Sequence, residues 1–284
     1  MTVVRLDSAP SLAPLLARGA LRSPLKRVAQ GAVAPPTRLV LRDAAVDPGR
    51  LAAYRAVCGF PESGSTAPSA GLPVTYPHIL GFPLAMRLMA AREFPLPLLG
   101  LVHTTFAVDQ HRPVPSSERP ELTVYAEKLS PHRRGTEALL VTEARLAGEL
   151  VWESRSTYLA RHSTSYEGPV PERSGDDAPL PVRAEWDLPG DLGRRYGAAS
   201  GDRNPIHLHP LTAKLFGFPR AIAHGMWTVA RCLSEYGVEG SVRLRAEFRA
   251  PVLLPGRVAY GVEGERFELR GAGEKVHLSG AVSP

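Results

Sequence analysis

Alternation of hydrophobic and polar residues is the main regularity of the chain, and it occurs in two series of segments. The segments of both series are residues 98–110, 121–131, 137–148 and 150–162, then 241–254, 257–271 and 275–282. In each segment, β-branched or aromatic residues alternate with polar ones and turn-forming residues follow. This pattern is typical of antiparallel strands with one face in water. The sequence therefore predicts two antiparallel sheets.

A helical pattern precedes each series of strands. In residues 223–237, hydrophobic side chains fall on one helical stripe, and Gly237 stands where a C-terminal cap belongs. Residues 78–94 show a similar stripe, and Pro83 predicts that this helix begins there. Each half of the chain is therefore expected to contain one helix followed by an antiparallel sheet, which is an α+β arrangement.

Short sequence matches relate the two halves to each other. YRAVCG at 54–59 and YGAASG at 196–201 share the pattern Tyr-x-x-x-[Cys/Ser]-Gly. PVTYPH at 73–78 and PRAIAH at 219–224 both place His five residues after Pro. The two members of the first pair and the two members of the second pair are separated by nearly the same number of residues. Together with the repeated order of helix and sheet, this predicts an internal duplication.

A stretch without hydrophobic periodicity separates the two halves. Residues 163–182 concentrate Pro, Gly, Ser and charged residues, which is typical of an exposed linker. The prediction is a first domain over residues 1–162, including an N-terminal arm at 1–37, and a second over 183–284. Where the second half reads SGDRNPIH, the first reads CGFPESGSTAPSAG, with no Asp or His at the matching places. We therefore expect the first domain to be degenerate and the second to carry the chemistry.

Composition and charge restrict the class of protein. The 284 residues are 44% hydrophobic and 22% charged, as in an ordinary globular protein, and no run of 18 apolar residues occurs. We expect no membrane span, no secretory segment and a cytoplasmic location. Cys58 and Cys232 predict reduced thiols rather than a disulfide framework or a zinc ribbon.

The formal net charge of +6 favours acidic partners. The basic residues are scattered, and short groups such as SPHRRG at 130–135 lack interleaved aromatic residues and form no long stripe. We therefore expect no nucleic-acid partner. A phosphorylated small molecule or an acidic carrier protein fits the charge at least as well.

The candidate chemistry lies in the stretch YGAASGDRNPIHLHP. Asn204 precedes Pro205 and is a natural helix N-cap, while Gly201 is free to take a positive φ. Asp202 and His207 stand five residues apart and can converge across this cap and turn. A carboxylate that orients an imidazole, or shares a water molecule with it, is the minimal apparatus for acid–base chemistry near neutral pH.

Two other interpretations of this cluster stay open. Asp202 and Asn204 could simply cap a turn. Alternatively, His207, His209 and His224 could be metal ligands. His207 and His209 lie only two residues apart, however, and no Glu or Cys completes a recognisable ligand set. We therefore expect no metal.

A longer stretch carries a family resemblance. YGAASGDRNPIHLHPLTAKLFGFPRAIAHGMWTVA, residues 196–230, resembles the hydratase 2 motif of the MaoC-like, (R)-specific enoyl-thioester hydratases and 3-hydroxyacyl-thioester dehydratases. The resemblance extends to the whole chain as a double hotdog, two helix-plus-antiparallel-sheet repeats in one chain. It implies that the second repeat is catalytic and that the first is degenerate.

The resemblance also implies the reaction. The family hydrates trans-2-enoyl thioesters reversibly to (R)-3-hydroxyacyl thioesters by syn addition, in fatty-acid or related acyl metabolism, and dehydrates in the reverse direction. Such a hydro-lyase needs no cofactor. In this family, the residues at the positions of Asp202 and His207 hold the water that adds to C3, while a proton reaches C2 from the same side.

Further residues are implied to bind the substrate. The Asn at the position of Asn204 fixes the loop, and the backbone N–H at the position of Gly225 binds the thioester carbonyl, where a helix N-terminus is a preorganised donor. Ser200 and His224 are assigned to the same substrate-binding group. His224 could equally be structural, because its counterpart His78 survives in the degenerate half.

Several alternatives remain at the level of function. A hotdog acyl-thioesterase would also bind acyl thioesters at a helix start, and a non-catalytic acyl-thioester-binding subunit is a second rival. The carrier could be coenzyme A or acyl carrier protein, and both a monomer and a homodimer fit a double hotdog. Residues 61–73, rich in Gly, Ser, Ala and Pro, predict room for a medium-to-long acyl tail.

Overall fold

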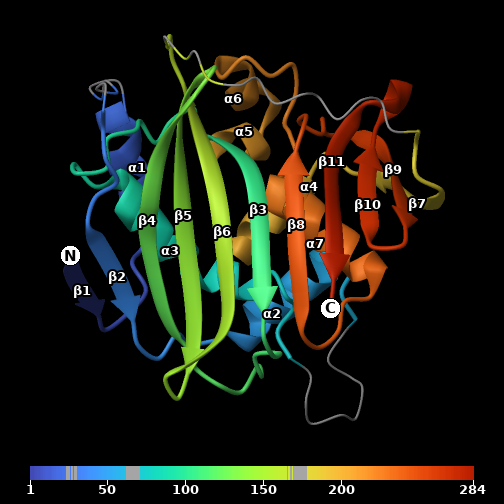
Figure 1. The fold of residues 1–284 in the computed structure, drawn as a ribbon. Helices are drawn as coiled ribbons and strands as arrows, with labels where there is room; N and C mark the ends of the chain where they lie inside the picture. Colours follow the sequence, from blue (N-terminus) through green and yellow to red (C-terminus); the bar gives the residue numbers. More distant parts are fainter. Residues whose placement is uncertain are drawn as a thin grey trace. The chain divides into compact units, whose positions relative to one another are not determined.

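The computed structural model describes residues 1–23, 26, 28, 31–61, 71–164, 166, 168 and 178–284. Figure 1 shows their helices and strands. The chain forms two compact units, the first comprising Met1–Ala45, Pro77–Ala107 and Arg119–Asp177, and the second comprising Val46–Tyr76, Val108–Glu118 and Ala178–Pro284. The predicted domain boundary at 163–182 stays a prediction about the sequence halves, and its positions 165, 167 and 169–177 lie outside the described residues.

The first unit is built on a sheet with the strand order β1-β2-β4-β5-β6-β3. Its strands are β1 (Thr2–Leu6), β2 (Thr37–Leu41), β3 (Val102–Gln110), β4 (Glu121–His132), β5 (Gly135–Leu146) and β6 (Glu149–Arg161). Residues 108–110 of β3 belong to the second unit. β1 pairs with β2 in parallel, whereas β2, β4, β5 and β6 pair antiparallel. The four predicted strands are confirmed, and β1 and β2 come in addition. The arm at 1–37 provides β1 and helix α1 (Leu12–Arg22).

Helix α3 (Tyr76–Ala90) lies behind β4, β5 and β6 in Figure 1. Its backbone approaches the sheet closely, because a Cβ on Gly81 would lie 2.7 Å from Cγ2 of Thr142 on β5. The prediction that this helix begins at Pro83 is wrong, since Pro83 lies inside it. Burial of Tyr76 and Ile79 in the first turns favours helix there and outweighs the hydrogen bond that proline cannot donate.

The second unit contains a sheet with the strand order β8-β11-β10-β9-β7 and antiparallel pairing throughout. Its strands are β7 (Val182–Leu188), β8 (Val242–Phe248), β9 (Gly256–Glu263), β10 (Arg266–Arg270) and β11 (Val276–Ser283). The single strand predicted over 257–271 is wrong, because β9 and β10 form a hairpin there. Gly264 in the turn has φ 56°, a left-handed conformation that favours glycine.

The helices of the second unit come from both halves of the sequence. They are α2 (Pro48–Cys58), α4 (Leu192–Ser200), α5 (Pro205–Leu208), α6 (Pro210–Leu215) and α7 (Gly225–Tyr236), followed by the 3₁₀ turn η2 (Ala272–Glu274). The predicted C-terminal cap of α7 at Gly237 is confirmed by its φ of 82°. Residues of α2 and α4 pack against each other. A helix of the first half of the sequence therefore belongs to the unit that carries the polar cluster.

The two sheets confirm the internal duplication. When β1 is set aside, each half has five strands among the described residues, and the first borders the third, followed by the fourth, the fifth and the second, giving β2-β4-β5-β6-β3 and β7-β9-β10-β11-β8. The matching motifs also end alike, because Gly59 caps α2 with φ 78° and Gly201 caps α4 with φ 85°. The helix-plus-sheet repeat predicted from the sequence is therefore present twice.

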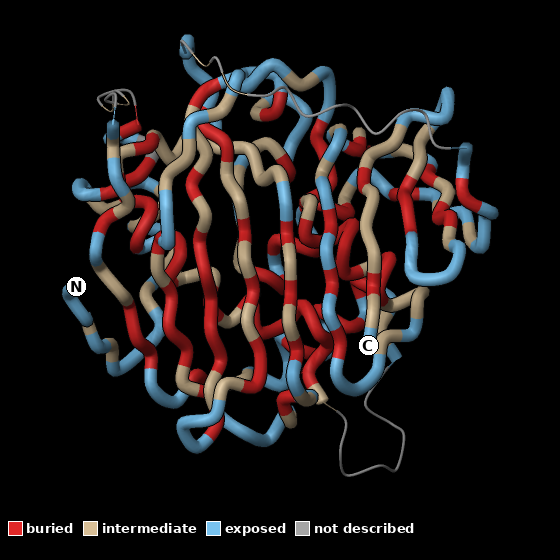
Figure 2. Tube along the Cα trace, in the orientation of Figure 1, coloured by how far each residue is buried: buried red, intermediate tan, exposed pale blue. Residues whose placement is uncertain are grey.

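Each unit has its own buried core, which runs along the strands in Figure 2. In the second unit, α7 buries Val229 and Leu233, and β10 buries Phe267 and Leu269. Cys58 and Cys232 are buried free thiols, as predicted. Among the described residues, no helix combines the length and the apolar character needed to span a membrane.

Candidate active site

The polar cluster lies on the loop between α4 and α5, in the second unit. Gly201 has the predicted positive φ, and Asn204 is the predicted N-cap, since its Oδ1 accepts a hydrogen bond from the Ile206 N–H at 3.4 Å. The Asn204 N–H donates to Oδ1 of Asp202 at 3.1 Å. The residue that caps α5 therefore also orients the carboxylate.

Two glycines of α4 allow this loop to lie against the helix. A Cβ on Gly193 would lie 1.9 Å from the His207 carbonyl oxygen, and a Cβ on Gly197 would lie 2.8 Å from the Asp202 carbonyl oxygen. Any side chain there would push the two candidate catalytic residues away from α4. These glycines were not predicted as part of the site, although their four-residue spacing with Gly201 forms a smooth helical face and was the available signal.

His207 is held in one tautomer by the backbone. Its Nδ1 lies 2.8 Å from the Ile222 carbonyl oxygen, which can only accept a hydrogen bond, so Nδ1 carries the hydrogen. Burial lowers the pKa of His207, while the charge of Asp202 and the bond to Ile222 raise it. The neutral ring therefore leaves a lone pair on Nε2. Ile222 was not predicted as part of the site.

His224 precedes α7 and is only 2% exposed. Its Nε2 lies 2.9 Å from the Asp202 carbonyl oxygen and therefore donates to it, while Nδ1 has no partner among the described residues. The His224 ring stacks on His207 with centroids 3.7 Å apart. Burial, and then the charge of His207, lower the pKa of His224 well below its usual value. His224 thus joins the start of α7 to the backbone of Asp202 as a neutral imidazole.

The Asp202 carboxylate keeps contact with solvent, since its side chain is 28% exposed. Desolvation raises the pKa of Asp202, and the charge of His207 and the Asn204 N–H lower it. Ser200, assigned to substrate binding in the sequence, is buried and its Oγ accepts a hydrogen bond from the Asp202 N–H at 3.2 Å. The structure thus places the Ser200 hydroxyl on the backbone of the loop.

Gly225 is the first residue of α7, directly after His224. Within the described part of the chain, its N–H donates to no other residue, so it is a free donor at the positive end of a 12-residue helix. A Cβ on Gly225 would lie 2.9 Å from Cε1 of Phe248. Glycine therefore permits the close approach of the Phe248 ring to this helix start.

The structure does not bring together the three histidines of the alternative metal site. His209 is exposed and caps α6, its Nδ1 accepting from the Leu211 N–H at 3.1 Å. Asp202 takes its place, and one ligand atom from each of Asp202, His207 and His224 lies within 4.8 Å of the others. A carboxylate and two imidazoles can hold a water molecule or a divalent cation, so an experiment must distinguish them.

Aromatic residues from both halves of the sequence support the cluster. The Tyr196 ring packs on His224 with centroids 4.8 Å apart, and the Tyr54 ring of α2 lies 5.9 Å from Tyr196. The Tyr54 hydroxyl bonds to Oγ1 of Thr75 at 2.8 Å. The repeated Tyr-x-x-x-[Cys/Ser]-Gly motif thus supplies adjacent aromatic residues. The predicted space for an acyl tail at 61–73 falls mainly on 62–70, outside the described residues.

Comparisons with known proteins agree with this architecture. The model of the MaoC-like domain matches residues 177–277. The 3-hydroxyacyl-thioester dehydratase X of Mycobacterium tuberculosis is 38% identical over 221 residues, which are 76% of this chain and 76% of that protein. The crystal structure of HtdX from Mycobacterium tuberculosis matches with a TM-score of 0.74 at 35% identity, covering 86% of this chain and 98% of that one.

A more distant structure identifies the fold. A conserved hypothetical protein of Mycobacterium tuberculosis, described as a double hotdog, matches with a TM-score of 0.50 at 12% identity and covers 86% of this chain and 94% of that one. The predicted α+β double hotdog is confirmed. The similarity to the dehydratase over three quarters of both sequences shows that the chain belongs to the MaoC-like dehydratase family.

Proposed function

We propose that the protein is a hydro-lyase that reversibly hydrates trans-2-enoyl thioesters to (R)-3-hydroxyacyl thioesters. The dehydratase name of the relative at 38% identity supports this reaction class. The observation that carries the proposal is the meeting of Asp202 and His207 beside the start of α7. It combines a proton acceptor, a carboxylate and a free backbone donor.

In the hydration direction, a water molecule between Asp202 and His207 loses a proton and its oxygen bonds to C3. The Nε2 lone pair of His207 accepts a hydrogen bond from this water, because Nδ1 already carries the ring hydrogen. The Asp202 carboxylate orients the same water. A proton returns from this pair to C2 on the same face, so that H and OH add across the double bond without any other reactant.

Negative charge develops on the thioester oxygen as C3 is attacked. The Gly225 N–H donates to this oxygen, and the α7 dipole stabilises the charge. His224 keeps this donor near the acid–base pair. Its side chain donates a hydrogen bond to the Asp202 carbonyl oxygen, and it directly precedes Gly225 in the sequence. On this view, His224 and Asn204 position the reacting groups, and Ser200 fixes the loop.

The experiment is to follow the loss of enoyl absorbance with crotonyl-CoA and trans-2-decenoyl-CoA and to determine the C3 configuration of the product. We expect the (R) product from the wild type. Asp202→Asn and His207→Ala should each reduce kcat/KM by about 10²–10⁴-fold while the far-UV circular dichroism stays unchanged. Folded wild-type protein that hydrates neither substrate, nor the acyl carrier protein thioester, contradicts the proposal.

Control measurements separate the alternatives. Pretreatment with a chelator should leave the rate unchanged, whereas loss of activity that Zn²⁺ or Mg²⁺ restores would favour the metal interpretation of the cluster. Release of free thiol would favour the thioesterase. Binding of the enoyl thioester without turnover would favour the non-catalytic subunit.

The finer features are part of the same proposal. We propose coenzyme A or acyl carrier protein as the thioester carrier, a medium-to-long acyl chain, a cytoplasmic location and catalysis by the repeat at 183–284 beside a degenerate repeat at 1–162. A homodimer also fits a double hotdog. Relative rates on crotonyl and decenoyl substrates test the chain length, and size-exclusion chromatography with light scattering tests the oligomeric state.

A further inference from the structure

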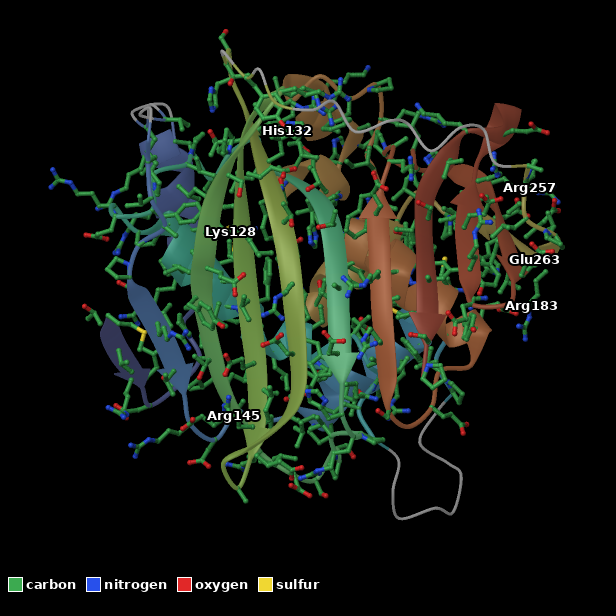
Figure 3. All side chains as sticks on the ribbon, viewed as in Figure 1. Lys128, His132, Arg145, Arg183, Arg257 and Glu263 are labelled. Atoms are coloured by element: carbon green, nitrogen blue, oxygen red, sulfur yellow. The ribbon has the colours of Figure 1, made fainter. Side chains whose placement is uncertain are left out.

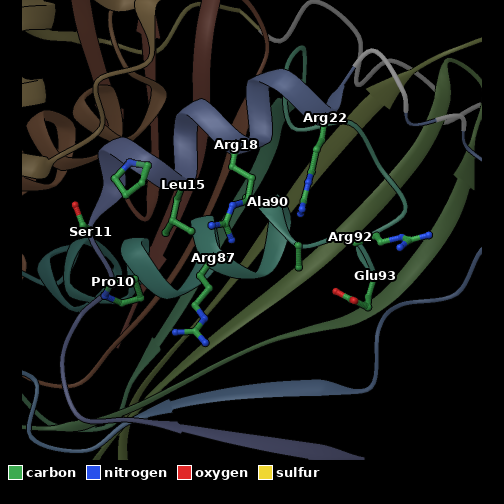
Figure 4. A pocket seen from close by; sticks show the side chains of 11 residues that line it. Pro10, Ser11, Leu15, Arg18, Arg22, Arg87, Ala90, Arg92 and Glu93 are labelled. Atoms are coloured by element: carbon green, nitrogen blue, oxygen red, sulfur yellow. The ribbon is translucent and has the colours of Figure 1, made fainter.

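A cavity of about 650 Å³ lies in the first unit, between α1 and the C-terminal end of α3. Figure 4 shows Arg18 and Arg22 extending from α1 into the cavity, whereas Arg87 extends from α3 on the side away from α1. Leu15 of α1 and Ala90 of α3 form part of its apolar lining. The cavity is thus lined by apolar side chains and by solvent-exposed arginines of both helices.

Polar contacts fix the helix that forms one wall of this cavity. The Ser23 hydroxyl donates to the Gly19 carbonyl at 2.7 Å and accepts from the Leu99 N–H at 2.9 Å. A Cβ on Gly19 would lie 2.2 Å from Cδ2 of Leu98, so α1 lies very close to this segment. These contacts hold the arginines of α1 opposite α3 on a defined backbone.

Lys26 fixes the other wall. Its Nζ donates to the Ala91 carbonyl at 2.9 Å and the Phe94 carbonyl at 2.6 Å, at the end of α3. Burial and then the positive charge of Arg22 lower the pKa of Lys26, while Glu93 raises it. The ammonium group is therefore committed to backbone carbonyls and adds its positive charge to this end of the unit.

The arginines of the cavity differ from those on the sheets. On the sheets, for example, Arg145 pairs with Glu143 at 3.1 Å and Arg249 pairs with Glu247 at 2.8 Å, and Figure 3 shows Arg145 at the lower end of the first sheet. Within the described ranges, no ion pair involves the arginines of the cavity, which are Arg18, Arg22, Arg87 and Arg92. Among the residues that the structure describes, the positive charge of these arginines therefore has no carboxylate within ion-pair distance.

The concentration of positive charge opposes folding only weakly, because the four arginines are exposed to solvent. Arg18 and Arg22 are four residues apart on one helix, where like charges repel, and Arg87 adds a further positive charge from the facing helix. Glu93 is the acidic residue among the lining residues and offsets only part of this charge. A bound anion would remove the repulsion.

We propose that this cavity binds a small organic molecule with two or more phosphate groups. Guanidinium groups bind phosphate through paired, charge-assisted hydrogen bonds. The cavity volume lies within the range of small-molecule sites, roughly 300–1,000 Å³, and the apolar wall suits an organic group beside the phosphates. This site goes beyond the reaction proposed for the second unit and does not depend on it.

The test is isothermal titration calorimetry on the full chain at low salt, with adenosine 3′,5′-bisphosphate as the probe. Separate titrations with adenosine and with inorganic phosphate distinguish binding of the organic group from binding of the anion. The variant Arg18→Gln/Arg87→Gln removes two cavity charges. The matched control Arg133→Gln/Arg134→Gln removes two exposed charges from the β4–β5 turn of the same unit. We expect the bisphosphate Kd to rise at least about tenfold in the cavity variant and to stay within about twofold in the control.

The remaining outcomes decide against the proposal or define the ligand. The proposal is wrong if the folded wild type does not bind the bisphosphate, if both double variants bind it equally, or if inorganic phosphate binds as tightly. If the cavity variant loses binding to an acidic carrier protein but keeps its binding to the bisphosphate, the cavity is instead assigned to a protein partner. A KM for crotonyl-CoA that rises in parallel with the bisphosphate Kd would identify the phosphates as those of coenzyme A.

Discussion

His224 and His78 occupy matching positions in the two repeats, yet their surroundings differ. His224 lies one residue before α7 and donates from Nε2 to the Asp202 carbonyl oxygen at 2.9 Å. His78 lies inside α3, is 5% exposed and packs against Phe106 with ring centroids 5.0 Å apart. Its Nδ1 has no partner in the described part of the chain. His224 is therefore hydrogen-bonded to the loop that carries the Asp202 carboxylate, whereas His78 is buried among aromatic rings.

The start of the helix explains much of this difference. α3 begins two residues before His78, so the following residue, Ile79, is already within the helix and buried. α7 begins one residue after His224, and the following residue is Gly225, whose N–H remains free. A changed helix start and one glycine thus leave a free backbone donor at the start of α7.

Within this comparison of the two helix starts, the largest effect is expected when Gly225 is given a side chain. Gly225→Ala places a methyl group 2.9 Å from the Phe248 ring and displaces the first turn of α7. Loss of an aligned oxyanion donor should reduce kcat by about 10²-fold, with a smaller change in KM. Steady-state hydration of crotonyl-CoA measures this. The double variant Gly225→Ala/Phe248→Leu should recover part of kcat, and equal activities of Gly225→Ala and the wild type would remove Gly225 from the proposed mechanism.

A smaller effect is expected from the paired variants His224→Gln and His78→Gln. His224→Gln weakens the hydrogen bond that holds the Asp202 backbone to α7, and we expect kcat to fall about tenfold and the pH–rate profile to shift. His78→Gln should leave kcat unchanged, because its ring contacts place His78 beside His103 and Phe106 of the first unit. Equal losses in both variants would show that the histidines share a purely structural role.

Local sequence patterns were sufficient for much of the fold and for the central pair of the site. Alternation predicted the long strands, and the Asn-Pro pair correctly predicted the cap that orients Asp202. These features depend on neighbouring residues, whose geometry follows from backbone preferences. The turn at Gly264 was missed although the sequence carries a signal for it, because four non-hydrophobic residues at 263–266 interrupt the alternation between Val262 and Phe267.

Features that depend on distant contacts were not predicted. The hydrogen bond from His207 to Ile222 requires the segment before α7 to lie against α5, as the Ile222 N–H and the Ile206 carbonyl show at 3.2 Å. The packing of Tyr54 near Tyr196 requires α2 to join the second unit. Neither local propensity nor spacing specifies such long-range packing.

The smallest effect concerns stability, and it isolates the contribution of His78. Burial lowers the pKa of His78 to about 4, below the value of about 6.5 expected in the unfolded chain. Between these values the unfolded state binds more protons, so the free energy of unfolding rises with pH. The His78 contribution is full above the unfolded pKa and is lost as pH falls from about 6.5 to 4.

Urea denaturation at pH 7 and about pH 5.8 measures this loss, which should be about 1 kcal/mol for His78. Other buried histidines contribute in the same direction, because burial also lowers the pKa of His207 and His224. The informative quantity is therefore the difference between the wild type and His78→Gln, whose stability should depend less on pH by that amount. The same pH dependence in both proteins would mean that His78 binds protons equally in the folded and unfolded states, and its contrast with His224 would then be one of partners alone.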